Sequence, residues 1–503
     1  MKSKVLLGFL SILGSKLGVV LLGLIITPIL VRLLGSTLYG DYAFVMSMLG
    51  ITMILVNAGI FDGTRKFMVE DRDQQNWQDY VFGFYFRVAL GLAFLVLLSF
   101  VLFAWTGLPR QLFGVEFVLY FYLLGVLVLG RQVFSVARGG LISLGLEKKS
   151  EPLPIIKKVL FGIISLSLVY VGYGVVGVLV GQIVATVVVS IIALVILFKR
   201  LDLDAVFGRV PSDFPKRRLL SFNKLSVVFI LLTTSLYHID ILLLQPLAGS
   251  QATGYYRASL VIAEFLWLVP NVCQTVLLHS SSELWSKKQT DEITELISRV
   301  TRYNIAFLVL VGLGLTALAK DFVPLYFGAE FEESVLPLLI LLPGVIGFAI
   351  SRPIFAIGQG KGSLRVLIMA TGTAALINLF LNLLLIPEYG MTGAAIATSI
   401  GYGSMLIFHV LAARQIGFNP LMDLRLNRIA VTGFVTAIVI FSSTALIESA
   451  ILSLVVVPPV GFVVYMLIGL KIRIVSPDEI REGTNRLPDP ISSLVNWTAA
   501  IID

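Results

Sequence analysis

Apolar runs that are long enough to cross a lipid bilayer follow one another along almost the whole chain. A helix needs about 20 apolar residues to span the hydrocarbon core, and lipid offers no hydrogen-bond partner to a backbone that is not helical. Only 14% of the residues are charged and the mean hydropathy is +0.95, which excludes a soluble domain with a single anchor. The sequence therefore predicts an all-α, polytopic membrane protein with about fourteen transmembrane helices, at positions 5–31, 42–60, 83–104, 115–137, 154–172, 176–198, 224–246, 256–279, 303–319, 334–357, 364–386, 391–413, 429–447 and 450–470.

The basic residues between these runs define an orientation. Lys and Arg gather in every second loop, whereas the opposite loops are short and carry few of them. Because cytoplasmic loops are enriched in Lys and Arg, we expect both termini in the cytoplasm and the protein in the plasma, or inner, membrane. The formal net charge of +8 then reports orientation, and we expect no nucleic-acid partner. The first apolar run is too long for a cleaved signal peptide, so we expect it to remain as the first helix.

A short motif between two apolar runs occurs twice. The first copy, LLGSTLYGDYA at Leu33–Ala43, returns as LAGSQATGYYRA at Leu247–Ala258. Four identical residues stand at the same offset of 214 (249 − 35, 250 − 36, 254 − 40 and 256 − 42). Three further matches have offsets of 214, 213 and 216: Arg138 with Arg352, Leu144-Gly145 with Ile357-Gly358, and Tyr173-Gly174 with Tyr389-Gly390. The conserved order and near-constant offset indicate an internal duplication.

The duplication predicts the domain organisation. Six predicted helices separate equivalent points, and because six is even, the two copies share one orientation about an axis along the membrane normal. We expect a six-helix bundle, a basic cytoplasmic linker, a second six-helix bundle, two appended transmembrane helices and a cytoplasmic tail, at residues 1–200, 201–223, 224–413, 414–470 and 471–503. We also expect an amphipathic helix along the inner membrane surface at Ser280–Arg302.

The two motifs and the six-plus-six arrangement resemble a known family. The stretch LLGSTLYGDYAF, its counterpart IDILLLQPLAGSQATGYYRAS and the two extra helices are similar to the polysaccharide-biosynthesis flippases, over about residues 5–413. These form the Wzx-type branch of the multidrug/oligosaccharidyl-lipid/polysaccharide exporter superfamily. The resemblance implies a flippase that moves a polyprenyl-(pyro)phosphate-linked oligosaccharide from the cytoplasmic to the outer leaflet by alternating access, for cell-surface polysaccharide or glycoprotein synthesis. It also implies membrane lipids as partners and glycosyltransferases of the same pathway as candidate partners.

Charged side chains within the apolar runs are the candidate site residues. A charge at the bilayer centre costs roughly 2.5–3.5 kcal/mol on insertion scales, so such a residue predicts a function. Lys16 lies about 11 residues into the first run, close to mid-bilayer, where an ammonium group suits a phosphate or pyrophosphate. The other basic candidates for binding the substrate or lining its path are Arg32, Arg131, Arg138, Arg257 and Arg352. For Arg138 and Arg352, at the inner ends of equivalent helices, anchoring at the cytoplasmic surface is the alternative.

Three acidic residues accompany them near the outer half of the predicted cleft: Asp41, Asp240 and Glu264. Glu264 follows Arg257 by seven residues, which places both on one face of the predicted helix. Two interpretations remain open. The charges form salt bridges that gate the outer side, or the carboxylates couple transport to H⁺ or Na⁺. For Arg32 and Arg257, snorkelling to the outer interface is a third interpretation.

No pattern for covalent chemistry stands out. The chain has one cysteine and three histidines, too few for a disulfide or a histidine-based metal centre. We therefore expect no metal, no cofactor and no enzymatic reaction, and the short outer loops disfavour a glycosyltransferase. Two alternatives to a flippase remain: a cation-coupled multidrug exporter of the same superfamily, and a non-transporting scaffold that recruits glycosyltransferases through its basic inner loops.

Overall fold

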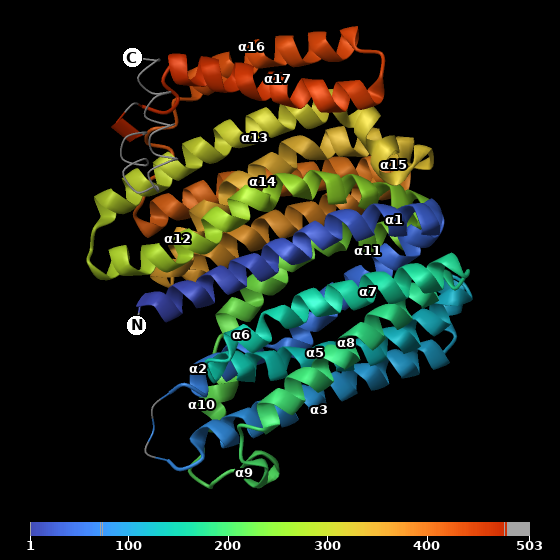
Figure 1. The fold of residues 1–503 in the computed structure, drawn as a ribbon, viewed down its shortest axis with the longest axis vertical. Coiled ribbons are helices and arrows are strands. Elements are labelled where there is room, and N and C mark those ends of the chain that lie inside the picture. Colours follow the sequence, from blue (N-terminus) through green and yellow to red (C-terminus); the bar gives the residue numbers. More distant parts are fainter. Residues whose placement is uncertain (1, 71, 73, 477, 480–503) are drawn as a thin grey trace. The chain divides into compact units, whose positions relative to one another are not determined.

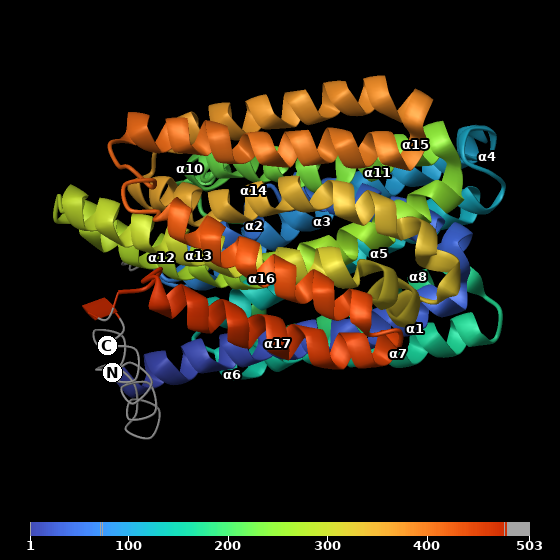
Figure 2. The same cartoon turned by 90° about the horizontal axis from the view of Figure 1, so that it is seen from above.

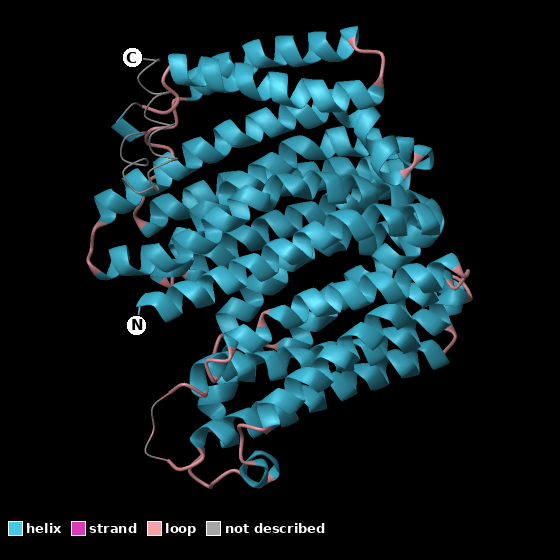
Figure 3. Ribbon diagram, viewed as in Figure 1, coloured by secondary structure: helices cyan, strands magenta, loops and turns pink. Residues whose placement is uncertain are grey.

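The computed structural model describes residues 2–70, 72, 74–476, 478 and 479, without the side chains of residues 2–13, 16 and 279. The described residues form helices and loops and contain no strand (Figure 1, Figure 3). This confirms the predicted all-α membrane fold. The helices are α1 (Lys2–Asn57), α2 (Ile60–Phe67), α3 (Trp77–Trp105), α4 (Leu108–Leu112), α5 (Glu116–Ser143), α6 (Glu147–Ser150), α7 (Pro152–Tyr170), α8 (Gly174–Phe198), α9 (Leu203–Phe207), α10 (Lys216–Ser221), α11 (Lys224–Ala263), η1 (Glu264–Trp267), α12 (Leu268–Ser286), α13 (Thr290–Phe327), η2 (Ala329–Ser334), α14 (Val335–Lys361), α15 (Leu364–Ile416), α16 (Leu426–Leu446) and α17 (Ala450–Lys471).

Three of the long helices contain a glycine whose backbone is not helical. Gly35 in α1 has φ 68° and ψ 176°, and Gly249 in α11 has φ 86° and ψ 174°. In α15, Gly390 has φ 53° and ψ −130°. Residues with a Cβ rarely adopt these angles, so glycine allows the chain to leave one helix and begin the next without a loop. Gly35 and Gly249 stand 214 residues apart with nearly the same angles, so the duplicated motif is a duplicated kink.

The glycine kinks bear on the number of spans. Eleven helices in the described part of the chain are long and apolar enough to cross a membrane. Three of these contain the kinks at Gly35, Gly249 and Gly390, and each is long enough for two crossings. Counting each of the three twice gives 11 + 3 = 14. Fourteen spans therefore stay a prediction that the kinks make physically reasonable.

The other sequence matches differ in how well the backbone follows them. Gly174 has φ 49° and Gly390 has φ 53°, so this pair has similar left-handed backbone in both copies. Gly145 has φ 70°, whereas Gly358 lies inside the helix α14. The repeat is thus retained at the kinks and lost at this inner turn.

The chain divides into two compact units, and the first comprises Met1–Arg257 and Leu379–Ala394. Within it α3, α5, α7 and α8 run side by side, and α1 packs against α5 and α7 (Figure 1). Small residues allow the close approach of these helices: the Gly162 position on α7 lies against Ile26 of α1, and Gly125 on α5 lies against Leu97 of α3. Aromatic side chains fill one end of the bundle, among them Trp77, Phe82, Phe86, Phe134, Phe198 and Phe214.

The predicted linker at residues 201–223 is folded within this unit. It contains α9 and α10, and its apolar residues Val206, Phe214 and Leu219 are buried. The Arg87 guanidinium of α3 donates to the carbonyl oxygens of Val206 and Gly208 at 2.9 and 3.0 Å. Basic residues of the linker therefore lie on a segment whose apolar side chains pack onto the bundle.

The second unit comprises Ala258–Asn378 and Ala395–Asp503. In it α14 packs against α12 and α13, and α16 and α17 form an antiparallel pair that packs on α13 (Figure 2). Leu318, Ile440 and Val457 are the buried contacts of that pair with α13. The predicted domain boundaries stay a prediction, because compactness alone does not identify the ends of the duplicated bundles.

The segment Ser280–Arg302 is not a single helix on the membrane surface. α12 continues to Ser286 and α13 begins at Thr290, so the segment is the end of one helix and the start of the next, joined by a tight turn. Its apolar residues Ile293 and Ile297 are fully buried. The Ser298 hydroxyl donates to the Asn419 carbonyl oxygen at 3.0 Å. The amphipathic pattern predicted the exposed and buried faces correctly, but the apolar face packs on protein and not on lipid.

Candidate functional site

The two copies of the duplicated kink cross each other within the first unit. A Cβ atom added at Gly40 would overlap the carbonyl oxygen of Ser250, and one added at Gly254 would overlap the carbonyl oxygen of Ser36. The two contacts are reciprocal, because Ser36 corresponds to Ser250 and Gly40 to Gly254 at the offset of 214. The two copies therefore pack backbone to backbone, and only glycine fits at either position.

Asp41 lies at this crossing in a polar network. Its carboxylate accepts a hydrogen bond from the side-chain amide of Gln245 at 3.0 Å, and the same amide donates to the Ser250 hydroxyl at 2.8 Å. Asp41 is 7% exposed and Gln245 is 5% exposed. The arrangement joins the second half of α1 to the first half of α11. Sequence reasoning selected Asp41 but missed Gln245, which lies in an apolar run and carries no charge.

Asp240 is held inside α11. Its carboxylate accepts a hydrogen bond from the Tyr256 hydroxyl, which bridges the two arms of the helix across the Gly249 kink. Both residues are fully buried. Tyr256 is the repeat equivalent of Tyr42, whereas the position equivalent to Asp240 is Ile26, so only the second copy carries this pair.

Arg131 lies near the middle of α5, and its surroundings contain more positive than negative charge. Its Nε is buried without a hydrogen-bond partner, and no described carboxylate forms an ion pair with it. Arg131 and Arg257 are both close enough to Tyr42 for their charges to act on its hydroxyl. The first unit therefore brings together Arg131 and Arg257 on α5 and α11, beside the second half of α1.

Lys157 is a basic residue of this region that the sequence analysis did not select as a site residue, although it falls within the predicted run 154–172. It lies in α7, which begins at Pro152, and its ammonium group sits over the Phe134 ring at 5.0 Å. The charges of Arg131, Arg138 and Lys158 all act on it, and no described carboxylate pairs with it. Proline at the first position of a helix is a known start signal, and Pro152 begins α7 two residues before the predicted run at 154.

Arg138 forms the one ion pair of this basic set. Its guanidinium donates to the Glu151 carboxylate at 2.9 Å, and Glu151 is 3% exposed. Arg138 and Glu151 thereby tie the end of α5 to the start of α7. One carboxylate accompanies three basic side chains, Arg131, Arg138 and Lys157, in this part of the described structure.

Lys16 lies in α1, and its side chain is outside the described residues. The neighbouring Ser15 is buried, and its hydroxyl donates to the Glu151 carbonyl oxygen at 2.7 Å. Lys16 is 35 − 16 = 19 residues from the Gly35 kink, which corresponds to roughly 28 Å of helix. Its backbone therefore lies level with the start of α7, beside the Arg138–Glu151 pair.

Arg32 and Arg352 have different settings. Arg32 is exposed near the Gly35 kink, next to the exposed apolar residues Ile29 and Leu33. In the second unit Arg352 is 7% exposed, and its guanidinium lies 4.6 Å from the centre of the Trp267 ring and 4.8 Å from that of Phe348. Arg352 also donates to the Gln274 side chain at 3.3 Å. The repeat partners Arg138 and Arg352 thus contact a carboxylate and aromatic rings, respectively.

Glu264 begins the short 3₁₀ turn η1 in the second unit and is half-buried. α11 ends at Ala263, directly before it, so Arg257 and Glu264 do not lie in one continuous α-helix. No group of three or more His, Cys, Asp and Glu side chains that could hold a metal ion occurs among the described residues.

Comparison with known proteins identifies the family. The model of the polysaccharide biosynthesis protein family matches residues 5–277, which are 273 of the 503 residues. The chain belongs to this family. The match confirms the family resemblance that the two duplicated motifs indicated.

Curated relatives of this polysaccharide biosynthesis protein include two from archaea. An uncharacterised membrane protein of Methanocaldococcus jannaschii is 23% identical over 272 residues, 54% of each chain. A probable low-salt glycan biosynthesis flippase of Haloferax volcanii is 23% identical over 203 residues, 40% of this chain and 42% of the relative. The chain spans about half the length of the curated relatives it matches.

Solved structures share the fold. The lipid II flippase MurJ in an inward closed conformation superposes with a TM-score of 0.75 at 15% identity, over 92% of this chain and 98% of that one. A multidrug resistance MATE transporter in an inward-facing conformation gives a TM-score of 0.64 at 17% identity, over 79% and 94%. At these identities the likeness shows that the polysaccharide biosynthesis protein has the fold of both, and no more.

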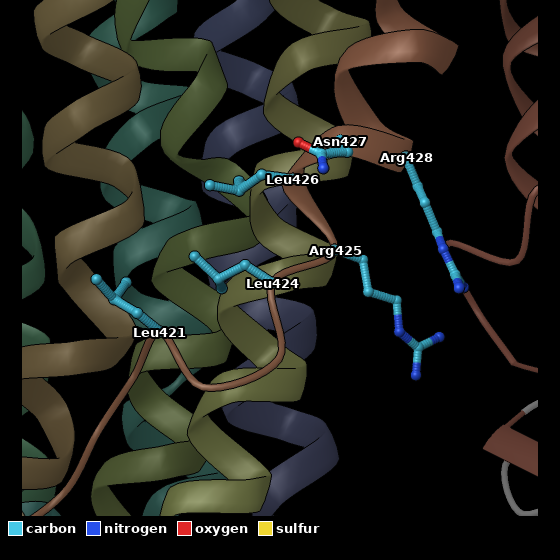
Figure 4. A pocket seen from close by; sticks show the side chains of 6 residues that line it. All are labelled: Leu421, Leu424, Arg425, Leu426, Asn427 and Arg428. Atoms are coloured by element: carbon cyan, nitrogen blue, oxygen red, sulfur yellow. The ribbon is translucent and has the colours of Figure 1, made fainter.

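A surface hollow of about 610 Å³ lies along the loop between α15 and α16 of this family member, and its lining consists of Leu421, Leu424, Arg425, Leu426, Asn427 and Arg428. Figure 4 shows Leu421, Leu424 and Leu426 on one side of the connecting loop, and Arg425 and Arg428 extending away from them on the other. Arg425 donates to the carbonyl oxygens of Arg473 and Ile474 at 3.1 and 3.2 Å, and Arg428 to that of Arg473 at 2.7 Å. Both guanidiniums therefore hold the segment that follows α17.

Proposed function

We propose that this protein is a flippase that moves a polyprenyl-(pyro)phosphate-linked oligosaccharide from the cytoplasmic to the outer leaflet of the plasma membrane by alternating access. The family, the flippase among the curated relatives and the fold shared with a lipid II flippase all support the proposal. The protein breaks no covalent bond in this cycle. Both termini are cytoplasmic, so the kinks at Gly35 and Gly249 face the outside. The physiological product is a cell-surface polysaccharide or glycoprotein.

The observation that carries the proposal is the excess of positive charge inside the first unit. Arg131, Arg138 and Lys157 belong to two neighbouring membrane helices, and in the described structure Glu151 pairs with Arg138 alone of the three. Burying a basic side chain without an opposite charge is expensive, so a membrane protein retains such a set where an anion neutralises it. A diphosphate carries the required charge and offers several acceptor oxygens to guanidinium and ammonium groups.

Each basic residue has a place in this proposal. Lys16, Arg138 and Lys157 receive the diphosphate at the cytoplasmic end, and Arg131 binds it farther along α5. Arg257 and Arg32 meet it toward the outer end, and Arg352 acts in the same way from the second unit. Asp41, Asp240 and Glu264 act in gating, or bind the H⁺ or Na⁺ that drives the cycle. Glycosyltransferases of the same pathway supply the substrate.

A cation-coupled multidrug exporter is the second candidate, and the shared MATE fold favours it. A site for cationic drugs needs acidic residues that are free to pair with the drug. The Asp41 carboxylate is instead hydrogen-bonded to Gln245, and Asp240 to Tyr256. These contacts favour the anionic substrate.

A ligand-binding experiment separates the two candidates. Purified protein is heated with farnesyl pyrophosphate, a short polyprenyl diphosphate, with farnesol, which lacks the phosphates, or with the lipophilic cation tetraphenylphosphonium. We expect only the diphosphate to raise the unfolding temperature, and Arg131→Ala to abolish that rise. The exposed Arg110 of α4 gives the matched control, and Arg110→Ala should retain it. Stabilisation by tetraphenylphosphonium alone would favour the exporter and contradict the proposal.

A further inference from the structure

Where the duplicated kinks cross, the backbones of α1 and α11 touch and leave no passage between them. We propose that Gln245 is a latch that holds α1 and α11 together at this crossing by bridging Asp41 and Ser250, and that substrate passes only when the latch opens. The proposal rests on the flippase function above and adds a positioning residue to it. On the proposed topology the crossing lies at the outer side, so the latch closes the outer gate.

The first argument is steric. Each copy of the motif carries a small residue, three others and a glycine: Ser36 to Gly40 in α1, and Ser250 to Gly254 in α11. This spacing puts two small residues on one helix face and allows two membrane helices to touch through their backbones. The glycines lie directly against the serine carbonyl oxygens of the other copy, in both directions. The crossing leaves no room for a substrate.

The second argument is that the polar bridge is not reciprocal. The repeat equivalent of Gln245 is Val31, and the equivalent of Asp41 is Tyr255. The packing of glycine on serine therefore occurs twice, whereas the hydrogen bonds from Gln245 to Asp41 and Ser250 occur once. Duplication explains the symmetric packing. It does not supply the single buried amide, whose hydrogen bond to Asp41 strengthens the crossing on one side only.

The third argument follows α1 and α11 away from the kinks. Beyond the crossing, His238 of α11 lies against Gly50 of α1, and its Nδ1 is 3.2 Å from the Ser47 hydroxyl. Farther along, near the ends of the same helices, a cavity of about 220 Å³ lies between them, lined by Met53, Ile54, Asn57, Gly59, Asp62, Asn223, Ser226, Val227 and Ile230. The two helices are thus in contact at the kink end and separated by a cavity at the other.

These contacts define what has to break. Separating the kinks breaks the hydrogen bond from Gln245 to Asp41 and the backbone packing at Gly40 and Gly254, whereas the hydrogen bond from Gln245 to Ser250 lies within α11. Loss of the amide should raise the population of the open state, by about five- to tenfold for one net buried hydrogen bond. No bond rearrangement or bound ion is required.

The test measures access to the crossing and needs no substrate. Ala43 is 4% exposed and lies on the stripe of α1 that includes Gly40, Ser47 and Gly50, at helical spacings of three and four. Ala43→Cys is introduced with Cys273→Ala, so that the reporter is the single thiol. In right-side-out membrane vesicles, a membrane-impermeant maleimide reaches this thiol only through an open outer crossing. Gln245→Leu should increase the labelling rate about five- to tenfold.

A matched control comes from the next glutamine. Gln251 lies in the same segment of α11, but its amide donates to the Tyr255 hydroxyl at 3.1 Å within its own helix. Gln251→Leu should label at the original rate. The proposal would be overturned if Gln245→Leu were labelled at the same rate as the protein that retains Gln245. An equal rise in the labelling rate of Gln251→Leu would also overturn it.

A second variant covers failure of Gln245→Leu to fold. Gln245→Glu retains the shape of the side chain and sets a carboxylate against Asp41, so it should also label faster. Folding is checked from the unfolding temperature of each variant. If the labelling follows the prediction while the protein moves no glycolipid, the proposed function fails and the latch stands. If transport is retained and labelling does not respond to either variant, the latch fails alone.

Discussion

Arg138 donates a hydrogen bond to Glu151 over 2.9 Å, from the end of α5 to the start of α7. The same Glu151 accepts the Ser15 hydroxyl of α1 on its backbone carbonyl at 2.7 Å. Three membrane helices therefore meet at one residue, whose side chain is 3% exposed. Glu151 pairs with Arg138, and no described carboxylate pairs with the neighbouring Arg131 or Lys157.

The first prediction concerns this pair. Arg138→Met leaves a buried carboxylate without its hydrogen-bonded cation and should lower the free energy of unfolding by about 3 kcal/mol. Adding Glu151→Gln to the same variant removes the unpaired charge and should restore most of the loss. Unfolding in a denaturing detergent series measures both. A double variant that loses the sum of the two single losses would show that the residues do not interact.

The second prediction concerns the duplicated kinks. A side chain at Gly35 or Gly249 must adopt a backbone conformation that is nearly restricted to glycine, so Gly35→Ala and Gly249→Ala should each destabilise the fold by about 1–3 kcal/mol. Gly91 is the control. It lies inside α3 with open space around it, and Gly91→Ala should stabilise the helix by about 1 kcal/mol. Thermal unfolding measures all three variants. Equal shifts of the unfolding temperature in Gly35→Ala, Gly249→Ala and Gly91→Ala would refute the account.

The kinks also show how far the sequence could predict the fold. The apolar runs and the offset of 214 located Gly35 and Gly249, because a glycine between two spans and its repetition are both visible in the chain. The contact between the two copies was not visible. This contact depends on how α1 and α11 cross in space, which no local sequence pattern predicts.

The third prediction concerns pH and the cytoplasmic end of the second unit. Arg302 is fully buried in α13 and pairs with Asp423 and Glu479. Burial raises the pKa of both acids. For Asp423, the hydrogen bonds and charges of Arg425 and Arg302 lower the pKa further than burial raises it. The Ser476 N–H, Arg302 and Arg425 do the same for Glu479.

Because both folded pKa values lie below the ordinary 3.8 and 4.5, the stabilisation is fully present above those values. It is lost as the pH falls through the depressed folded pKa values. Arg302→Met should therefore cost about 2 kcal/mol at neutral pH, and the difference from the unaltered protein should shrink below pH 4.5. Lys287→Met, which removes an exposed pair with Glu283, should change stability little at either pH. A constant cost of Arg302→Met across this range would contradict the assignment.

The candidate site was only partly predictable, and the reasons are physical. Charge within an apolar run identifies Arg131 and Asp240 from the chain alone, because lipid makes such residues costly. Gln245 carries no charge and is revealed by its partners. Lys157 was not selected because it stands near the inner start of its predicted run, where basic residues are typical of the cytoplasmic interface. The depth of Lys16 in the membrane stays a prediction, because its side chain lies outside the described residues.

Transport itself tests the central claim most directly. The protein is reconstituted into vesicles that contain a fluorescent polyprenyl-pyrophosphate-linked oligosaccharide, and a membrane-impermeant lectin reports the glycan that reaches the opposite leaflet. We predict protein-dependent movement that Arg131→Ala slows by about ten- to a hundredfold, the effect of losing a charge-assisted hydrogen bond of 1.5–3 kcal/mol. Arg110→Ala should leave it unchanged. No movement by the unaltered protein, or equal rates for Arg131→Ala and the unaltered protein, would contradict the account.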